Sequence, residues 1–267
     1  MNLTLVRNLF LSVVCFGVLA PQAAATPAID GAILNLRVFN ADPGSTLSTI
    51  NSYPAIVEIS DTPTATPGFA NLHNFHLASG GSEAVFNNGD SFQFSADLRI
   101  SGAGDGEAGL QVAPWWSQDV DGRFNLRTTD GEIAVFGGRL PFYSFTGSHG
   151  LSYTKGDTVH VGVAYQANSL TLTDPATIEY MLTLGGTDYT SGPLAFSQGI
   201  LAEDPPHGLW GILNDARVGG YLQVFTAGSD ENVTATWGKL SFVPEPSICA
   251  LLLGWSALFL TVHKRHP

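Results

Sequence analysis

Cysteine is almost absent from this chain of 267 residues. The two cysteines, Cys15 and Cys249, both lie in apolar stretches close to the chain ends. The segment from Thr26 to Val243 therefore has none, which excludes a disulfide and a thiolate metal site there. A segment of about 218 residues is long enough to bury a substantial hydrophobic core, so we expect its stability to come from packing.

Positive charge is also scarce. Between Thr26 and Val243 there are 8 Lys and Arg residues against 22 Asp and Glu residues, a net charge of −14. Binding to nucleic acid requires clustered cations, so no nucleic-acid partner is predicted. The same balance argues against adhesion to an anionic lipid surface, and it suits a soluble domain or a calcium-binding one.

Long segments with helical periodicity are missing, and short alternating segments take their place. Three segments alternate apolar and polar residues with period two, at 92–100, 158–165 and 178–184. A period of two is typical of strands that bury one face. The composition, rich in glycine and interrupted by turn residues, predicts an all-β domain.

The spacing of the turns favours a β-sandwich of about twelve strands. Turn signals stand at 87–90, 121–122, 130–131, 155–157 and 185–186. Segments 221–225 and 233–237 are expected to form a hairpin around 227–230. This pattern resembles a concanavalin A-like (laminin G-like) jelly roll. An immunoglobulin-like sandwich is the alternative, but the segment is too long for one such domain and has no Cys–Trp–Cys framework.

The N-terminal residues 1–25 have the pattern of a secretory signal peptide. Arg7 precedes an apolar stretch at 9–20, and Ala23 and Ala25 supply small residues before a cleavage site that follows Ala25. A lipoprotein interpretation of Cys15 is disfavoured, because Val14 stands where a small residue is needed.

The C-terminal residues 244–267 combine a short polar element, an apolar run and a basic end. Residues 248–262 carry no charge, and as a helix they would span roughly 22 Å of a hydrocarbon core about 30 Å thick. Lys264 and Arg265 follow and would stay in the cytoplasm. A buried helix of the domain is the alternative, but this run lacks the polar face that such a helix shows.

Pro244, Glu245 and Pro246, the apolar run and the basic end together resemble the PEP-CTERM sorting signal of Gram-negative bacteria. The resemblance implies export, transient anchoring in the inner membrane, processing by an exosortase and sorting to the cell surface or the extracellular medium. Such proteins accompany exopolysaccharide production, so an extracellular polysaccharide is an expected partner. The basic end departs from the family pattern, because two histidines share it with one Lys and one Arg.

A tryptophan pair offers a candidate carbohydrate site. Aromatic faces stack on pyranose rings, and amide or guanidinium groups bind hydroxyls. The candidate ligand-binding residues are Trp115, Trp116, Gln118 and Arg123. Neighbouring residues of a strand face opposite sides, so we expect at most one of the two tryptophans to be exposed for a ligand. The alternative is that both serve packing only.

The same stretch resembles a calcium loop. Asp119, Asp121 and Asn125 supply alternating oxygen ligands around Gly122. The loop lacks the closing Glu of an EF-hand, and a hairpin turn at Asp121 and Gly122 is the preferred interpretation.

Enzyme signatures are not recognisable in the sequence. Sandwich glucanases carry a Glu-x-Asp-x-x-Glu pattern or a close variant on one strand, and none occurs here. A polysaccharide lyase needs a His/Tyr pair near Arg and Gln on strands, but no histidine stands in a familiar motif. His73 and His76 are three apart, which places them on opposite faces of a strand and disfavours a shared metal.

Two interpretations follow. We expect a non-catalytic β-sandwich, exported and either glycan-associated or structural in the extracellular polysaccharide matrix. The alternative is a divergent carbohydrate-active enzyme, a glycosidase or a polysaccharide lyase, on the same fold.

Overall fold

The computed structural model describes residues 26–64, 71–113, 122–199, 210–225 and 231–244, which form two antiparallel sheets and one short helix. The predicted signal peptide, the PEP-CTERM segment with its apolar run, and residues 114–121 lie outside these ranges. Among the described residues, none of the helices is long and apolar enough to cross a membrane.

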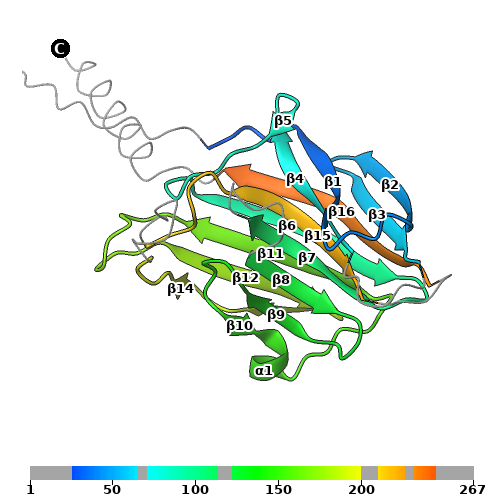
Figure 1. Cartoon of the computed structure of the whole chain (residues 1–267). Coiled ribbons are helices and arrows are strands. Elements are labelled where there is room, and N and C mark those ends of the chain that lie inside the picture. The colour runs from blue at the N-terminus through cyan, green and yellow to red at the C-terminus, as the bar shows by residue number, and fades with distance from the viewer. Residues whose placement is uncertain (1–25, 65–70, 114–121, 200–209, 226–230, 245–267) are drawn as a thin grey trace, which may run out of the picture.

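Each sheet contains eight strands, and we call them sheet A and sheet B (Figure 1). In spatial order, sheet A contains β1 (Gly31–Phe39), β4 (Leu72–Ser79), β15 (Arg217–Val224), β7 (Gly106–Ala113), β8 (Gly122–Arg127), β9 (Ile133–Phe136) and β10 (Tyr143–Ser144), with β5 (Ser82–Glu83) paired to β4. Sheet B contains β13 (Thr187–Thr190), β12 (Thr177–Leu184), β11 (Thr158–Gln166), β6 (Phe92–Ser101), β16 (Val233–Pro244), β3 (Ile56–Thr62) and β2 (Thr46–Ser52), with β14 (Leu194–Ala195) paired to β12.

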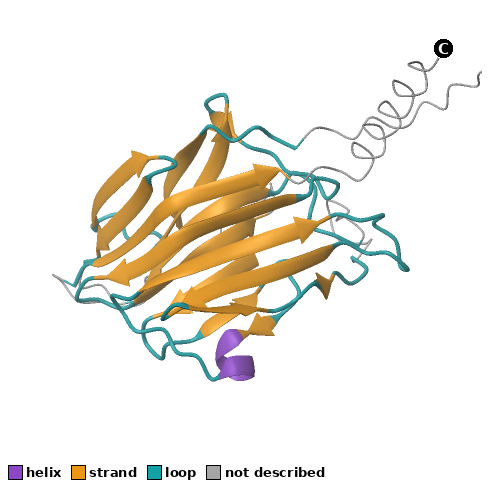
Figure 2. Cartoon of the chain, turned by 180° about the vertical axis from the view of Figure 1, so that it is seen from behind, coloured by secondary structure: helices purple, strands orange, loops and turns teal. Residues whose placement is uncertain are grey.

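The all-β prediction and the β-sandwich are confirmed. The helix α1 (Phe145–His149) is a single turn at the rim beside β9, purple in Figure 2. Ser144 caps its start by accepting a hydrogen bond from the backbone N–H of Gly147. The described residues hold sixteen strands rather than about twelve, because several short pieces extend the sheet edges.

The predicted C-terminal hairpin is wrong. Segment 221–225 falls largely within β15 in sheet A, whereas 233–237 belongs to β16 in sheet B, where it pairs with β3 and β6. The chain therefore crosses from one sheet to the other between these strands. Both strands carry the same alternation, and alternation identifies the face that is buried without identifying the neighbouring strand.

The core lies between the two sheets and is rich in aromatic side chains. Phe92, Phe94, Leu98 and Ile100 are buried, as the alternation of this strand predicts. Trp237 is fully buried, packs edge-on against Phe75 with ring centroids 5.1 Å apart, and donates its indole N–H to the carbonyl of Gly109 in the opposite sheet. These contacts join sheet B to sheet A at the centre of the sandwich.

Glycine is required opposite this indole. A Cβ atom placed on Gly220 would lie 2.8 Å from Trp237 Nε1 and 2.5 Å from the ring of Phe75. The small residue in β15 therefore lets the two sheets close over the indole.

Polar groups also occur between the sheets, near one edge. His73 and Asp61 are both fully buried, with His73 Nε2 3.3 Å from Asp61 Oδ2. The backbone N–H of Arg37 donates to His73 Nδ1, so the ring proton is on Nε2 and points at the carboxylate. Asn71 donates to the same carboxylate oxygen of Asp61, and this network ties β1, β3 and the start of β4 together.

Candidate active site on the outer face of sheet A

Strand register determines which side chains lie on the outer face of sheet A. In β7, Ala108, Leu110 and Val112 belong to the core between the sheets. The alternate residues Glu107 and Gln111 therefore lie on the outer face. The same alternation applies to β4, β15 and β8, whose core residues are Phe75, Leu77, Val218, Leu222, Phe124 and Leu126.

Pairing between these strands aligns their outward residues in three rows. The first row contains His76, Gly219, Gln111 and Arg123, on β4, β15, β7 and β8 respectively. The second row contains Asn74, Tyr221, Gly109 and Asn125, and the third contains Leu72, Gln223, Glu107 and Arg127. We call the polar members of the first two rows, together with Glu107 and Gln223, the polar strip.

Most of the polar strip is buried although it lies on the outer face of a sheet. Asn125 and Tyr221 are 0% exposed, Gln111 is 1% exposed and His76 is 4% exposed. Polar side chains on an outer face are usually solvated. Burial of this kind indicates a specialised surface.

His76 is held by a carboxylate. Its Nδ1 lies 2.8 Å from Glu83 Oε1, and the same oxygen accepts a hydrogen bond from the side-chain amide of Asn35. Arg217 Nε lies 3.3 Å from the other carboxylate oxygen. The hydrogen bond from His76, followed by those from Asn35 and the charge of Arg217, lowers the pKa of Glu83 to about 2 despite its partial burial.

This arrangement defines the proton positions on the imidazole of His76. A carboxylate only accepts hydrogen bonds, so Nδ1 carries the proton that points at Glu83. In the neutral ring, Nε2 then has a free lone pair. Within the described residues Nε2 is buried and has no hydrogen-bond partner. The structure thus presents a histidine oriented by a carboxylate, with an unused basic nitrogen.

Two buried carboxamides on the strip are also unpaired. Both polar atoms of Gln111 and both of Asn125 are buried with no hydrogen-bond partner in the described part of the chain. A buried unsatisfied polar group costs about 1–3 kcal/mol. Such groups in a native structure call for a specific explanation, and two adjacent carboxamides on one face provide donors and acceptors for a ligand.

Arg123, Glu107 and Tyr221 form the third part of the strip. Arg123 Nη1 makes an ion pair with Glu107 Oε1 and donates to Gln223 Oε1 at 2.9 Å. Its guanidinium carbon lies 5.3 Å from the centroid of the Tyr221 ring. The Tyr221 hydroxyl lies 3.5 Å from Glu107 Oε1. A Cβ atom on Gly109 would lie 1.7 Å from the carbonyl oxygen of Phe124 on β8 and 3.1 Å from the Tyr221 ring, so the neighbouring strand and the aromatic side chain together require glycine here.

Burial controls the protonation of this group. It raises the pKa of Tyr221 well above its ordinary value, so the phenol keeps its proton and acts as a donor. Burial also raises the pKa of Glu107, and the charge and hydrogen bond of Arg123 oppose this effect. Glu107 is therefore a carboxyl group whose charge depends on Arg123.

The structure locates part of the residue set predicted from sequence. Arg123 lies on the strip, where it contacts Glu107, Gln223 and Tyr221. Asn125 lies there too. Trp115, Trp116, Gln118, Asp119 and Asp121 are outside the described residues, so the tryptophan platform and the calcium loop stay predictions. No group of three His, Cys, Asp or Glu side chains within the described ranges is placed to hold a metal.

Sequence reasoning missed most of the strip. It placed His73 and His76 on opposite faces of one strand, which is confirmed, since His73 faces the core and His76 faces outward. It did not identify Tyr221, Gln111 or Glu107. The available signal was the alternation of polar and apolar residues in β7 and β15, which reads as an ordinary half-buried strand until the neighbours are known.

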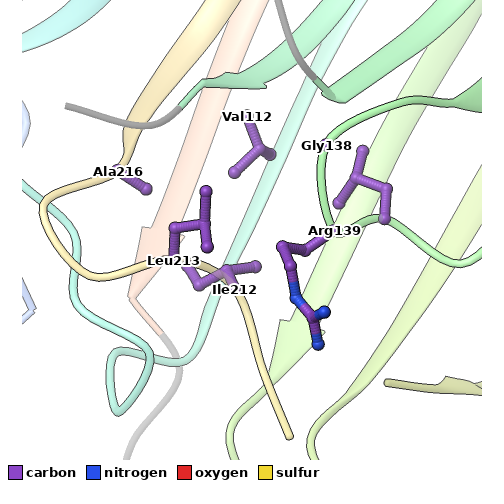
Figure 3. A pocket seen from close by; sticks show the side chains of 7 residues that line it. Val112, Gly138, Arg139, Ile212, Leu213 and Ala216 are labelled. Atoms are coloured by element: carbon purple, nitrogen blue, oxygen red, sulfur yellow. The ribbon is translucent and has the colours of Figure 1, made fainter. Parts of the chain in front are cut away.

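A small pocket elsewhere lacks comparable chemistry (Figure 3). Its lining is Val112, Gly138, Arg139, Leu140, Ile212, Leu213 and Ala216. Arg139 is its charged member, and it donates to the backbone carbonyl of Ser197. None of the strip residues lines this pocket.

No protein-family model and no curated protein matches the chain. Among solved structures, it is similar to the alginate lyase from Klebsiella pneumoniae, with 10% identity, a TM-score of 0.46, and 74% of this chain and 84% of that chain covered. It is also similar to a variant of alginate lyase A1-II′, with 8% identity, a TM-score of 0.45, and coverage of 80% and 95%. A third is the Lotus tetragonolobus seed lectin, with 10% identity, a TM-score of 0.44, and coverage of 81% and 100%.

The expectation of a non-catalytic domain is corrected by this finding. Several of the similar solved structures are alginate lyases. The sequence interpretation sought His, Tyr, Arg and Gln in the motifs of single strands. The structure assembles His, Tyr, Arg and Gln from four strands.

Proposed function

We propose that this protein is a polysaccharide lyase that cleaves an acidic polysaccharide by β-elimination, on a concanavalin A-like jelly roll. The observation that carries the proposal is the free, buried Nε2 of His76. Glu83 orients this nitrogen, which lies on the face that also carries Tyr221, Arg123 and Gln111. These are the four residue types that a lyase requires on its strands.

The proposed reaction uses these groups in distinct roles. His76 Nε2 takes the proton from C5 of a uronate unit, next to the carboxylate. The electrons of that C–H bond form the C4=C5 double bond, and the C4–O bond breaks with its electrons going to the leaving oxygen. The Tyr221 hydroxyl donates a proton to that oxygen.

The spacing on the strip suits one sugar unit. His76 and Gln111 flank Gly219 in one row, two strands apart, which corresponds to roughly 10 Å between backbones. Because Gly219 has no side chain, the surface of the sheet between His76 and Gln111 is free to contact a sugar ring. The amides of Gln111 and Asn125 are placed to hold the carboxylate and hydroxyls of a unit bound there, which stabilises the charge that develops as C5 loses its proton.

Hydrolysis fits the same face less well. A glycosidase needs two carboxyl groups about 5–9.5 Å apart across the scissile bond. The strip itself carries Glu107 in the third row, and Glu83 on β5 adjoins the strip through His76 in the first row. On β7 the first row is at Gln111 and the third row is at Glu107, four residues further back. Four residues along a strand correspond to roughly 13 Å, which is the separation of the two rows. The two carboxylates are therefore too far apart to act as a pair.

We also propose that the protein is exported and sorted, so that the polysaccharide it cleaves is extracellular. The signal-peptide pattern at residues 1–25 and the Pro244, Glu245 and Pro246 element with its apolar run support this placement. The intact mass of the protein recovered from cell envelope and medium tests it. Loss of the residues beyond Pro246 supports processing by an exosortase, and retention of 248–267 supports a permanent membrane anchor.

The lyase proposal is tested with a panel of acidic and neutral polysaccharides. We expect unsaturated uronate products from at least one acidic polymer, and a decrease in kcat of about 10²–10⁴-fold for His76→Gln. His160→Gln is the matched control, because His160 pairs with Asp97 on the outer face of sheet B. Reducing ends without unsaturated products would show hydrolysis, and full activity in His76→Gln would overturn the assignment of the base.

A further inference from the structure

Arg123 reaches along the strip to Glu107 and Gln223 in the third row. Its guanidinium binds Glu107 and Gln223 and lies over the ring of Tyr221. Gln111, its partner in the strand register, has an amide without any hydrogen bond among the described residues. The cation of the strip is thus held by a protein carboxylate, while the neighbouring amides of Gln111 and Asn125 are unused.

We infer that Glu107 and Arg123 form a latch that opens when a sugar carboxylate enters: Arg123 exchanges Glu107 for the carboxylate of the bound unit. This inference deepens the proposed function, since it takes an acidic sugar on the strip as the ligand. A guanidinium binds carboxylates through two parallel hydrogen bonds, so a sugar carboxylate competes with Glu107 on equal chemical terms. Gln111 and Asn125 add hydrogen bonds that Glu107 does not receive, which favours the exchange.

Opening the latch leaves Glu107 buried without its cation. The groups that face it are Arg123 and Arg127 on β8, with Tyr221 and Gln223 on β15. Arg127 is itself held by Asp130 and Glu132 and does not replace Arg123. A buried carboxylate without a cation has a high desolvation free energy. Glu107 therefore takes up a proton when Arg123 leaves.

The latch gives the site its preference for acidic sugars. A neutral sugar has no carboxylate that could replace Glu107 as the partner of Arg123, so Arg123 stays bound to Glu107. With an acidic sugar, the guanidinium of Arg123 leaves Glu107 and binds the sugar carboxylate. The carboxyl group of Glu107, now protonated, remains beside the Tyr221 hydroxyl. Binding of acidic ligands is therefore coupled to proton uptake, and the affinity rises as the pH falls towards the range in which Glu107 titrates.

The experiment measures binding by calorimetry on the full chain. The probes are uronate tetrasaccharides and the same tetrasaccharides after chemical reduction of their carboxyl groups. Titrations in two buffers with different ionisation enthalpies give the number of protons taken up on binding. We expect uptake with the acidic probes, no uptake with the reduced probes, and tighter binding of the acidic probes at lower pH.

Glu107→Gln keeps the side-chain shape and removes the competing charge. For this variant we expect the acidic probes to bind about tenfold more tightly near neutral pH, the ratio that corresponds to 1.4 kcal/mol. Proton uptake and the pH dependence of affinity are lost. Glu179→Gln on β12 of sheet B is the control for removal of one negative charge away from the strip, and it behaves like the wild type.

Several outcomes overturn the latch. One is the absence of proton uptake in the wild type, which needs no variant to fold. Another is equal or weaker binding by Glu107→Gln with unchanged proton uptake, which would show that Glu107 merely positions Arg123. Failure to bind any uronate probe overturns it as well. Binding with proton uptake but without unsaturated products keeps the latch and overturns the lyase.

Discussion

The outer faces of the two sheets carry similar residues in very different surroundings. Each face has a histidine paired with a carboxylate at 2.8 Å, His76 with Glu83 on sheet A and His160 with Asp97 on sheet B. The side chain of His160 is 43% exposed and that of His76 is 5% exposed. Solvent hydrates the pair of His160 and Asp97 and weakens the interaction between them. The pair of His76 and Glu83 instead keeps the basic Nε2 of His76 away from water. Burial on an outer face, rather than the pair itself, therefore distinguishes the candidate site.

The largest expected effect comes from removing the carboxylate that orients each histidine. Glu83→Gln should lower kcat by about 10²–10⁴-fold, because the imidazole loses the partner that keeps its proton on Nδ1. Asp97→Asn on sheet B should leave kcat unchanged. Steady-state kinetics on the polymer that the wild type cleaves checks both variants. Equal activity in the two would remove the functional difference between the faces.

Replacing an unpaired amide should separate stability from activity. Gln111→Leu fills a similar volume without leaving buried polar atoms unsatisfied, so we expect the free energy of unfolding to rise by about 1–2 kcal/mol. Activity should fall in the same variant, since the amide is proposed to hold the substrate. Gln93→Leu on the outer face of sheet B is the matched control, and its stability should change by less than about 0.5 kcal/mol. Chemical denaturation measures both changes.

The two glutamates of sheet A should respond to pH with opposite signs. The pKa of Glu83 is lowered in the folded state to about 2, so its contribution to stability is present above its ordinary pKa and is lost as the pH falls towards 2. The pKa of Glu107 is raised, so its ionisation opposes folding above its ordinary pKa. Glu83→Gln should therefore flatten the acid side of the stability curve, and Glu107→Gln should raise stability near neutral pH.

The smallest effect is expected from the exposed pair itself. His160→Ala removes a histidine whose ion pair with Asp97 is solvated, and exposed pairs contribute about 0–1 kcal/mol. We expect thermal unfolding to shift by no more than about 2 °C and activity to stay constant. A large loss of stability would show that the outer face of sheet B also carries structural interactions.

Much of the fold follows from the sequence because alternation reports burial directly. The strands at 92–100, 158–166 and 177–184 bury the side chains that their patterns indicate. The neighbours of each strand do not follow from the sequence in this way. β15 and β16 are consecutive in the chain but lie in opposite sheets. A hairpin and a crossing between sheets have the same local pattern, so only long-range packing decides between them.

The candidate site follows from the sequence only in fragments. The three-residue spacing of His73 and His76 determines that they face opposite ways, and the composition excludes a thiolate site between Thr26 and Val243. His76 pairs with Glu83 seven positions away, and Glu83 pairs with Arg217 across 134 positions, through sheet register. Arg123 meets Gln223 across 100 positions of sequence.

The sequence by itself determined the class of fold, the buried face of each regular strand and the absence of cysteine chemistry. Those properties depend on residue type and a period of two, which are local. The tertiary structure decided which strands are neighbours, and so brought His76, Gln111, Arg123 and Tyr221 onto one buried face. It also decided that these polar groups are shielded from water, because burial on an outer face depends on the whole molecule rather than on one strand.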